Sequence, residues 1–220
     1  MMHNTIQNLI KIKSELKLNL KNFKVANLPK IIAVSKTFKI NKILPLIEHG
    51  HLDFGENKIQ EAVDKWSDTK LRNPDIKLHM IGKLQTNKVK FAVKLFDYIH
   101  SVDTEKLAKK IADEQKKINK KIKIFIQVNI GDEEQKSGIK KTEVGDLISY
   151  CKKINLEVVG LMCLPPDDNN PSYYFKEMNL LNNSFDLTEL SMGMSSDYME
   201  ASKNFATYLR IGSSIFGKRF

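Results

Sequence analysis

Eight short runs rich in β-branched residues, separated by helical patterns, are the feature that most restricts the fold of this 220-residue chain. Alternation of strand and helix is typical of repeated βα units around a parallel sheet, and eight strands can close such a sheet into a barrel. The expected strands are residues 31–36, 52–56, 77–81, 98–102, 122–130, 157–164, 189–194 and 208–211.

The run at residues 122–130 shows the strand pattern most clearly. Isoleucine or valine occupies every second position from Ile122 to Ile130, whereas Lys123, Phe125 and Gln127 fall on the opposite face. Such alternation indicates a strand with two different faces. Helical patterns occupy the intervals, at residues 43–49, 58–66, 88–95, 104–118, 142–153, 172–182 and 197–205. Residues 1–20 add an amphipathic helix ahead of the first strand.

The sequence therefore predicts an α/β fold, a (β/α)₈ TIM barrel with an extra amino-terminal helix. A doubly wound open sheet is the alternative, because it uses the same alternation of strands and helices. No Gly/Ser-rich or Pro-rich linker interrupts the chain, so we expect residues 1–220 to form a single domain.

The charge and composition exclude several classes of function. A formal net charge of +10 at pH 7 is compatible with a nucleic acid or an anionic surface as partner. The lysines are nevertheless spread along the chain, and no basic cluster is interleaved with aromatic side chains that could stack on bases. No segment approaches the about 18 apolar residues of a membrane span. We expect no specific nucleic-acid partner and no membrane partner.

The two cysteines, Cys151 and Cys163, lack the spacing of metal ligands, and the opening residues do not resemble a secretion signal. This pattern favours a reduced, cytoplasmic protein with buried thiols and no structural metal.

Polar residues and glycines follow the expected strands at their carboxyl ends, where TIM barrels gather their chemistry. Lys36 closes the apolar run from Ile31, and Asn57 follows the second strand. An amine at the end of a buried strand can be desolvated, which favours its neutral, nucleophilic form and suits it to Schiff-base chemistry with an aldehyde.

The seventh and eighth strands end in segments rich in glycine and serine. TIM barrels often bind phosphate after these two strands. Glycine allows the backbone to approach a ligand closely, and serine hydroxyls and backbone N–H groups donate hydrogen bonds to an anion. The segments are Ser191-Met192-Gly193-Met194-Ser195 and Arg210-Ile211-Gly212-Ser213-Ser214. They predict a binding site for an anionic group.

Together these motifs resemble the pyridoxal phosphate homeostasis protein family, relatives of the amino-terminal barrel of alanine racemase. The resemblance runs in order along essentially the whole chain. The matching motifs are Ala33-Val34-Ser35-Lys36-Thr37, Phe54-Gly55-Glu56-Asn57, His79-Met80-Ile81-Gly82-Lys83-Leu84-Gln85-Thr86-Asn87-Lys88, Lys136-Ser137-Gly138, Gly160-Leu161-Met162, Leu190-Ser191-Met192-Gly193-Met194-Ser195 and Arg210-Ile211-Gly212-Ser213-Ser214.

The resemblance implies a barrel that holds pyridoxal 5′-phosphate (PLP) as a Schiff base on Lys36. It further implies that the cofactor is bound by Asn57 beside the ring, Arg210 against the pyridine nitrogen, and Met194, Ser195, Gly212 and Ser213 around the phosphate. Family members buffer or deliver the cofactor and are not known for efficient turnover. Apo forms of PLP-dependent enzymes are the expected recipients.

Two other functions remain as alternatives. An arginine facing the pyridine nitrogen disfavours protonation of that nitrogen, which makes the ring a poor electron sink. A racemase tolerates this arginine but needs a second base, which a separate carboxyl-terminal domain supplies in alanine racemase; we expect this chain, ending at Phe220, to lack that domain. A racemase that uses Tyr198 or His79 as its second base is the first alternative. A nucleic-acid or anionic-surface binder is the second.

Overall fold

The protein forms a closed parallel barrel. The structure, a computed structural model, describes residues 2–23, 27–168 and 170–217. Each strand pairs in parallel with the next along the chain, and β8 pairs with β1, so that Tyr208 lies opposite Lys30 and Ile211 opposite Ala33. The strands are β1 (Lys30–Val34), β2 (Asp53–Glu56), β3 (Lys77–Met80), β4 (Tyr98–Val102), β5 (Lys123–Val128), β6 (Glu157–Cys163), β7 (Glu189–Ser191) and β8 (Tyr208–Ile211). The predicted TIM barrel is confirmed, and the open-sheet alternative is wrong.

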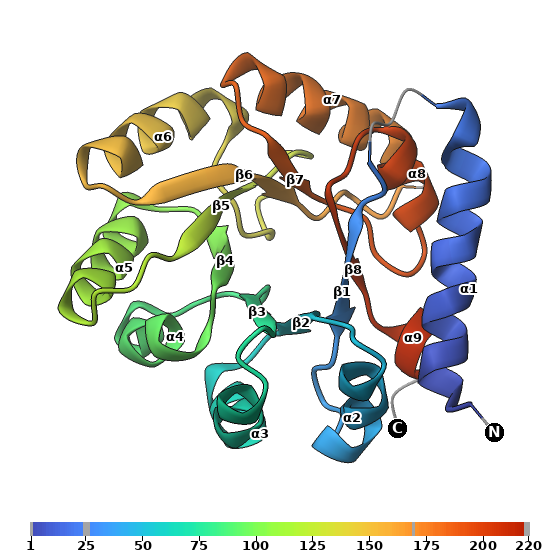
Figure 1. Cartoon of the computed structure of the whole chain (residues 1–220). Helices are drawn as coiled ribbons and strands as arrows, with labels where there is room; N and C mark the ends of the chain where they lie inside the picture. The colour runs from blue at the N-terminus through green and yellow to red at the C-terminus, as the bar shows by residue number, and fades with distance from the viewer. Residues whose placement is uncertain (1, 24–26, 169, 218–220) are drawn as a thin grey trace.

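The α-helices lie around the outside of the sheet (Figure 1). They are α1 (Asn4–Asn19), α2 (Ile40–Glu48), α3 (Ile59–Arg72), α4 (Val89–Leu95), α5 (Glu105–Lys117), α6 (Val144–Lys153), α7 (Pro171–Ser184), α8 (Tyr198–Lys203) and α9 (Ser213–Phe216). Short 3₁₀ turns are η1 (Leu20–Asn22), η2 (Thr86–Lys88) and η3 (Lys141–Glu143). The predicted amino-terminal helix is α1; it lies beside α9, where the Asn8 amide donates to the Ile215 carbonyl at 3.0 Å.

The two faces of the strands build two separate cores. Ile124 and Ile126 of β5 belong to the large cluster that the helices cover, whereas Phe125 packs in a second cluster with Ile32, Met162 and Tyr208. Members of the second cluster come from β1, β5, β6 and β8, and non-neighbouring strands can meet only across the barrel interior. The alternation in β5 therefore separates a helix-facing apolar side from an interior side.

Several predicted strands extend beyond the observed ones at their carboxyl ends. β1 ends at Val34 instead of residue 36, and β7 ends at Ser191 instead of residue 194. Soon after each end a residue adopts the left-handed region, Thr37 with φ +69° and Gly193 with φ +87°. The chain turns there, so Lys36 lies in the loop that leaves β1 and not in the strand.

Within the described ranges, no helix has both the length and the apolar character to cross a membrane. In the same ranges, no cluster of three or more His, Cys, Asp or Glu side chains could hold a metal ion. Cys151 and Cys163 are free and buried, and burial raises the pKa of each thiol to about 12.

Candidate functional site

Lys36 lies half-buried at the carboxyl end of the barrel, between two residues that α3 holds in place. On one side, the Thr37 backbone N–H donates to Glu61 Oε1 at 2.5 Å. On the other, Lys65 Nζ donates to the Ser35 carbonyl at 2.8 Å and to Glu61 Oε1 at 2.9 Å. Burial opposes the ionisation of Glu61, but the hydrogen bonds from Lys65 and Thr37 hold its pKa below the usual range. The backbone on both sides of Lys36 is thus fixed.

Behind this loop lies a buried ion pair. Lys65 Nζ lies 2.9 Å from Glu56 Oε1, and the two side chains are 8% and 0% exposed. The same oxygen accepts hydrogen bonds from Ser35 Oγ at 2.7 Å and from Trp66 Nε1 at 2.9 Å. β1, β2 and α3 are therefore joined at the point where the Lys36 loop begins.

Asn57 follows β2 and carries a polar atom that the protein leaves without a partner. Its Oδ1 is buried and accepts no hydrogen bond from any described residue. The neighbouring loop is packed closely, because a Cβ on Gly82 would lie 2.4 Å from the Asn57 carbonyl oxygen. A buried acceptor without a donor is costly, so this atom is suited to a ligand that donates a hydrogen bond.

Arg210 of β8 points into the barrel and is 4% exposed. Its Nη1 donates to Ser191 Oγ at 2.8 Å and its Nη2 to the Cys163 carbonyl at 2.7 Å. Burial lowers the pKa of Arg210, yet a guanidinium stays charged in proteins. No carboxylate of the described chain forms an ion pair with it. A buried cation of this kind favours an anionic or electron-rich ligand.

The loops after β7 and β8 meet at one oxygen atom. Ser195 Oγ accepts hydrogen bonds from the backbone N–H groups of Gly212 and Ser214, both at 3.3 Å. Gly193 shapes the first loop: its φ is +87°, and a Cβ there would lie 2.5 Å from Ala201 Cβ. Two backbone N–H groups that converge on one point can bind a phosphate oxygen there in place of the serine oxygen.

Two other residues predicted for the anion site have different surroundings. The Met194 backbone N–H donates to Asp197 Oδ1 at 2.6 Å, and Ser213 is exposed at the first position of α9. Ser214, which the sequence prediction did not include among the binding residues, donates alongside Gly212. The repeated serine at 213 and 214 made the two indistinguishable without the turn geometry.

The two candidate second bases are engaged elsewhere. The Tyr198 hydroxyl donates to Glu15 Oε2 of α1 at 2.6 Å, which directs it to the outside of the sheet. His79 is fully buried, and both of its ring nitrogens are hydrogen-bonded, to His100 at 2.9 Å and to Asp53 at 3.0 Å. The sequence analysis assigned no role to His100, Asp53 or Ser191. Each lies on the face of its strand that points into the barrel interior, and this alternation is the signal that could have found them.

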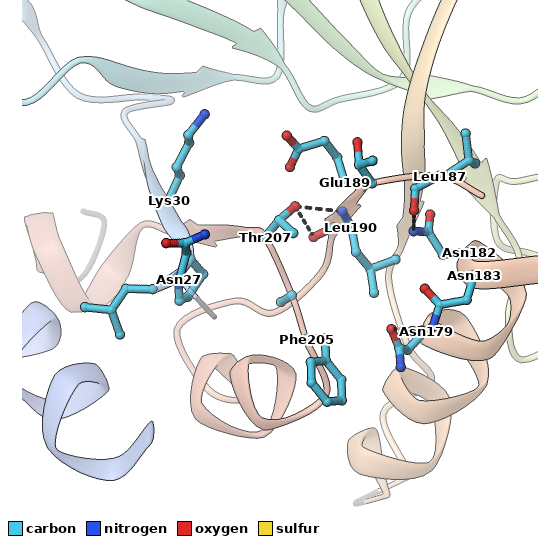
Figure 2. A pocket seen from close by; sticks show the side chains of 14 residues that line it. Asn27, Lys30, Asn179, Asn182, Asn183, Leu187, Glu189, Leu190, Phe205 and Thr207 are labelled. Carbon is cyan, nitrogen blue, oxygen red and sulfur yellow. Dashed lines mark hydrogen bonds between the residues drawn. The ribbon is translucent and has the colours of Figure 1, made fainter. Parts of the chain in front are cut away.

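A cavity of about 560 Å³ lies at the opposite end of the barrel, beside the beginnings of β1, β7 and β8 (Figure 2). Two of its polar side chains are hydrogen-bonded within the protein: Thr207 Oγ1 accepts from the Leu190 N–H at 2.7 Å, and the Asn182 amide donates to the Leu187 carbonyl at 2.7 Å. The unpartnered buried groups lie at the carboxyl end, so we place the functional site there.

Comparison with known proteins identifies the family. The family described as "Alanine racemase, N-terminal domain" matches residues 13–219. Pyridoxal phosphate homeostasis proteins are 36% identical to the chain in Aquifex aeolicus, over 88% of each sequence. In Homo sapiens the identity is also 36%, over 87% of this chain and 77% of the relative. The chain belongs to the pyridoxal phosphate homeostasis protein family.

Solved structures of the family share the fold over the full chain. PipY of Synechococcus elongatus, solved without PLP, has a TM-score of 0.85 at 30% identity and covers 98% of this chain and 100% of its own. The same protein with PLP bound has a TM-score of 0.84 at 28% identity. Alanine racemase of Clostridium difficile has a TM-score of 0.70 at 15% identity, and the match covers 57% of that chain, which shows a common fold.

Proposed function

We propose that this protein binds PLP through a Schiff base on Lys36 and acts in the intracellular buffering or delivery of the cofactor. The observation that carries the proposal is the buried guanidinium of Arg210, which forms no ion pair with a carboxylate among the described residues and lies on the strand next to the one that Lys36 follows. PLP supplies an aldehyde, a ring nitrogen that accepts a hydrogen bond, and an anionic phosphate. The chain offers a group suited to each of the three.

Lys36 provides the covalent link. Its amine would condense with the PLP aldehyde when the cofactor is bound, with the aldehyde oxygen released as water. The hydrogen bonds from Thr37 to Glu61 and from Lys65 to Ser35 hold the adjacent peptides, so the amine approaches from a fixed backbone. Fixing a reactive group in this way lowers the entropic cost of bond formation.

The phosphate fits the meeting point of the loops after β7 and β8. The N–H groups of Gly212 and Ser214 converge there, and the Ser195 hydroxyl is a third donor. In this structure Ser195 Oγ occupies the point where a phosphate oxygen would accept both N–H bonds, so the Ser195 side chain would turn aside on binding and then donate to the phosphate. Met194 and Ser213 complete the set that the family resemblance implies. The orphan Oδ1 of Asn57 is suited to accept a hydrogen bond from the bound cofactor.

The same groups favour a carrier over an enzyme. Arg210 can donate a hydrogen bond to the ring nitrogen. Unlike a carboxylate, it cannot stabilise the protonated form of that nitrogen, so the nitrogen stays largely unprotonated. The hydroxyl of Tyr198 is bonded to α1 and both nitrogens of His79 are bonded inside the barrel, so neither is poised as a second base. We therefore propose negligible racemisation of amino acids, with apo PLP-dependent enzymes as recipients of the cofactor. A cytoplasmic location fits the free thiols of Cys151 and Cys163.

The test uses purified protein mixed with PLP. We expect an absorbance band near the visible edge that borohydride removes, with the reduced cofactor on the peptide that contains Lys36. The Lys36→Ala variant should lose the band, whereas Lys39→Ala, an exposed lysine in the same loop, should keep it. Stable labelling of other lysines alone, with Lys36 unmodified, contradicts the proposal. Robust racemisation of alanine by the wild type contradicts the carrier role.

A further inference from the structure

Five side chains form an unbroken row of hydrogen bonds through the barrel interior, and each comes from a different strand. Asp53 Oδ1 lies 3.0 Å from His79 Nε2, and His79 Nδ1 lies 2.9 Å from His100 Nε2. His100 Nδ1 lies 2.8 Å from Ser191 Oγ, which accepts from Arg210 Nη1 at 2.8 Å. The row starts at the first residue of β2 and ends at the guanidinium of β8. We call it the interior relay.

Aromatic rings cover the middle of the interior relay. Tyr98 stacks on the His79 ring with a centroid distance of 4.5 Å, and Phe125 stacks on His100 at 4.2 Å. His79, His100 and Ser191 are fully buried, whereas the Asp53 side chain is 21% exposed. Enclosed hydrogen bonds in an apolar setting are strong when every member is paired, and costly when one is not.

Burial keeps the two histidines in the middle of the relay neutral. Burial, followed by the charges of His79 and Arg210, holds the pKa of His100 well below its usual range. Burial also lowers the pKa of His79, and the hydrogen bond to Asp53 opposes this only in part. Burial opposes ionisation of Asp53, but the hydrogen bond to His79 holds its pKa below the usual range, so it is a carboxylate.

With neutral rings, only one arrangement of protons satisfies every member. Arg210 can only donate, so Ser191 Oγ accepts from it and directs its own proton to His100 Nδ1. His100 then carries its proton on Nε2 and donates to His79 Nδ1, and His79 carries its proton on Nε2 and donates to the Asp53 carboxylate. In the reverse arrangement a bare His79 nitrogen would face the carboxylate, and the Ser191 proton would have no acceptor in the relay.

We propose that Asp53, His79, His100 and Ser191 are positioning residues that orient Arg210 for the ligand. The Asp53 carboxylate selects one tautomer of both histidines, which directs the Ser191 proton toward His100 Nδ1 and turns the lone pairs of the Ser191 oxygen toward Nη1. Together with the Cys163 carbonyl on Nη2, this fixes the plane of the guanidinium. Its remaining N–H groups are then presented in one direction. The use of Arg210 against PLP rests on the proposed function, whereas the proton arrangement does not.

The first experiment needs no cofactor. Nitrogen NMR of the isotope-labelled wild-type protein at neutral pH should show His79 and His100 uncharged, each with its proton on Nε2. A proton on Nδ1 of either ring, or an imidazolium at either, overturns the assignment. In Asp53→Asn the amide can present either its oxygen or its NH₂ to His79, so we expect mixed tautomers at both rings. If the tautomers of both rings are unchanged in this variant, Asp53 does not select them and has no role in the interior relay.

The second experiment measures the effect on PLP. Ser191→Ala deletes one of the two partners of the guanidinium, and we expect about tenfold weaker PLP binding together with a shifted absorption maximum. Ser191→Thr restores the hydroxyl and should recover the wild-type maximum. Tyr98→Phe is the matched control. It removes the hydroxyl of a ring that stacks on His79, and this hydroxyl makes no hydrogen bond in the relay, so the absorption maximum should be unchanged.

The outcomes separate the inference from the proposed function. If wild-type protein binds PLP on Lys36 and a folded Ser191→Ala variant binds it with unchanged affinity and spectrum, the positioning role is refuted and the proposed function stands. If the wild type does not bind PLP on Lys36, the proposed function fails, and the tautomers measured without cofactor still decide whether the relay orients Arg210.

Discussion

Replacing Lys65 with methionine tests how the Lys36 loop is held. Lys65 Nζ donates to Glu56, Glu61 and the Ser35 carbonyl, and its side chain is 8% exposed against 0% for Glu56. Methionine fills a similar volume without the charge, so the main effect is to leave the Glu56 carboxylate buried with only two neutral donors. Removing one partner of a buried ion pair costs about 3–5 kcal/mol.

That cost is large against the about 5–15 kcal/mol that stabilises a typical domain. At about 2–4 °C per kcal/mol for a chain of this size, the expected decrease in melting temperature is on the order of 10 °C. The Ser35 carbonyl also loses its donor, so the backbone beside Lys36 loosens and PLP retention should fall in parallel.

The assay is urea and thermal unfolding of the cofactor-free protein, followed by PLP titration. Lys58→Met is the control, because Lys58 is an exposed lysine just before the same helix, and its loss should change the free energy of unfolding by less than about 0.5 kcal/mol. In the double variant Glu56→Gln/Lys65→Met the buried charge is gone, so part of the stability should return. A Lys65→Met protein within about 1 kcal/mol of wild type would refute the reasoning.

Four further outcomes are expected. Ser195→Ala removes one donor to the proposed phosphate site, at about 1.5–3 kcal/mol, and should weaken PLP retention about ten- to a hundredfold in equilibrium dialysis; unchanged retention would exclude Ser195 from the site. Arg210→Glu should favour protonation of the ring nitrogen and shift the absorbance of bound PLP, and an identical spectrum in a folded, loaded variant would remove Arg210 from the ring. Burial lowers the pKa of His51 to about 4, so between pH 6.5 and 4 this histidine is protonated in the unfolded protein but neutral in the folded one. The protein should therefore lose stability as pH falls from about 6.5 to 4, and His51→Gln should flatten this part of the plot of unfolding free energy against pH. Residues 1–220 should unfold in one cooperative transition by calorimetry and circular dichroism if they form one domain, and two separated transitions would contradict this.

The architecture could be predicted because its signals are local. The strands are short runs rich in β-branched residues, with clear period-two alternation in β5, and the order of strands and helices limits the topology to very few forms. The position of Lys36 at the end of the first strand was likewise readable from the sequence. Its exact backbone setting was not, since the left-handed turn at Thr37 and its anchors Glu61 and Lys65 depend on α3 packing against β1 and β2.

The anion site stays a prediction, but the structure does bring its two predicted loops together. The glycine and serine residues after β7 and β8 led the sequence analysis to these loops. Which N–H groups converge depends on how the two loops pack, and the structure brings Gly212 and Ser214 to Ser195 Oγ. Ser213 and Ser214 are adjacent and identical, and single-sequence patterns do not resolve which of them contacts Ser195.

The interior relay shows why polar residues inside a barrel are difficult to recognise from the sequence. The helix-facing side of each strand must be apolar, so that side dominates the pattern; in β3, Leu78 and Met80 flank His79, and its neighbour across the pair is Gly55. Read alone, such a histidine is an ordinary core residue. Only the registers of several strands bring its ring to His100, and through Ser191 to Arg210. A buried arginine and a largely buried aspartate would each be unfavourable inside a barrel without hydrogen-bond partners. Joined by two neutral histidines and a serine, they satisfy one another's hydrogen bonds, and the polar interior becomes compatible with a stable fold.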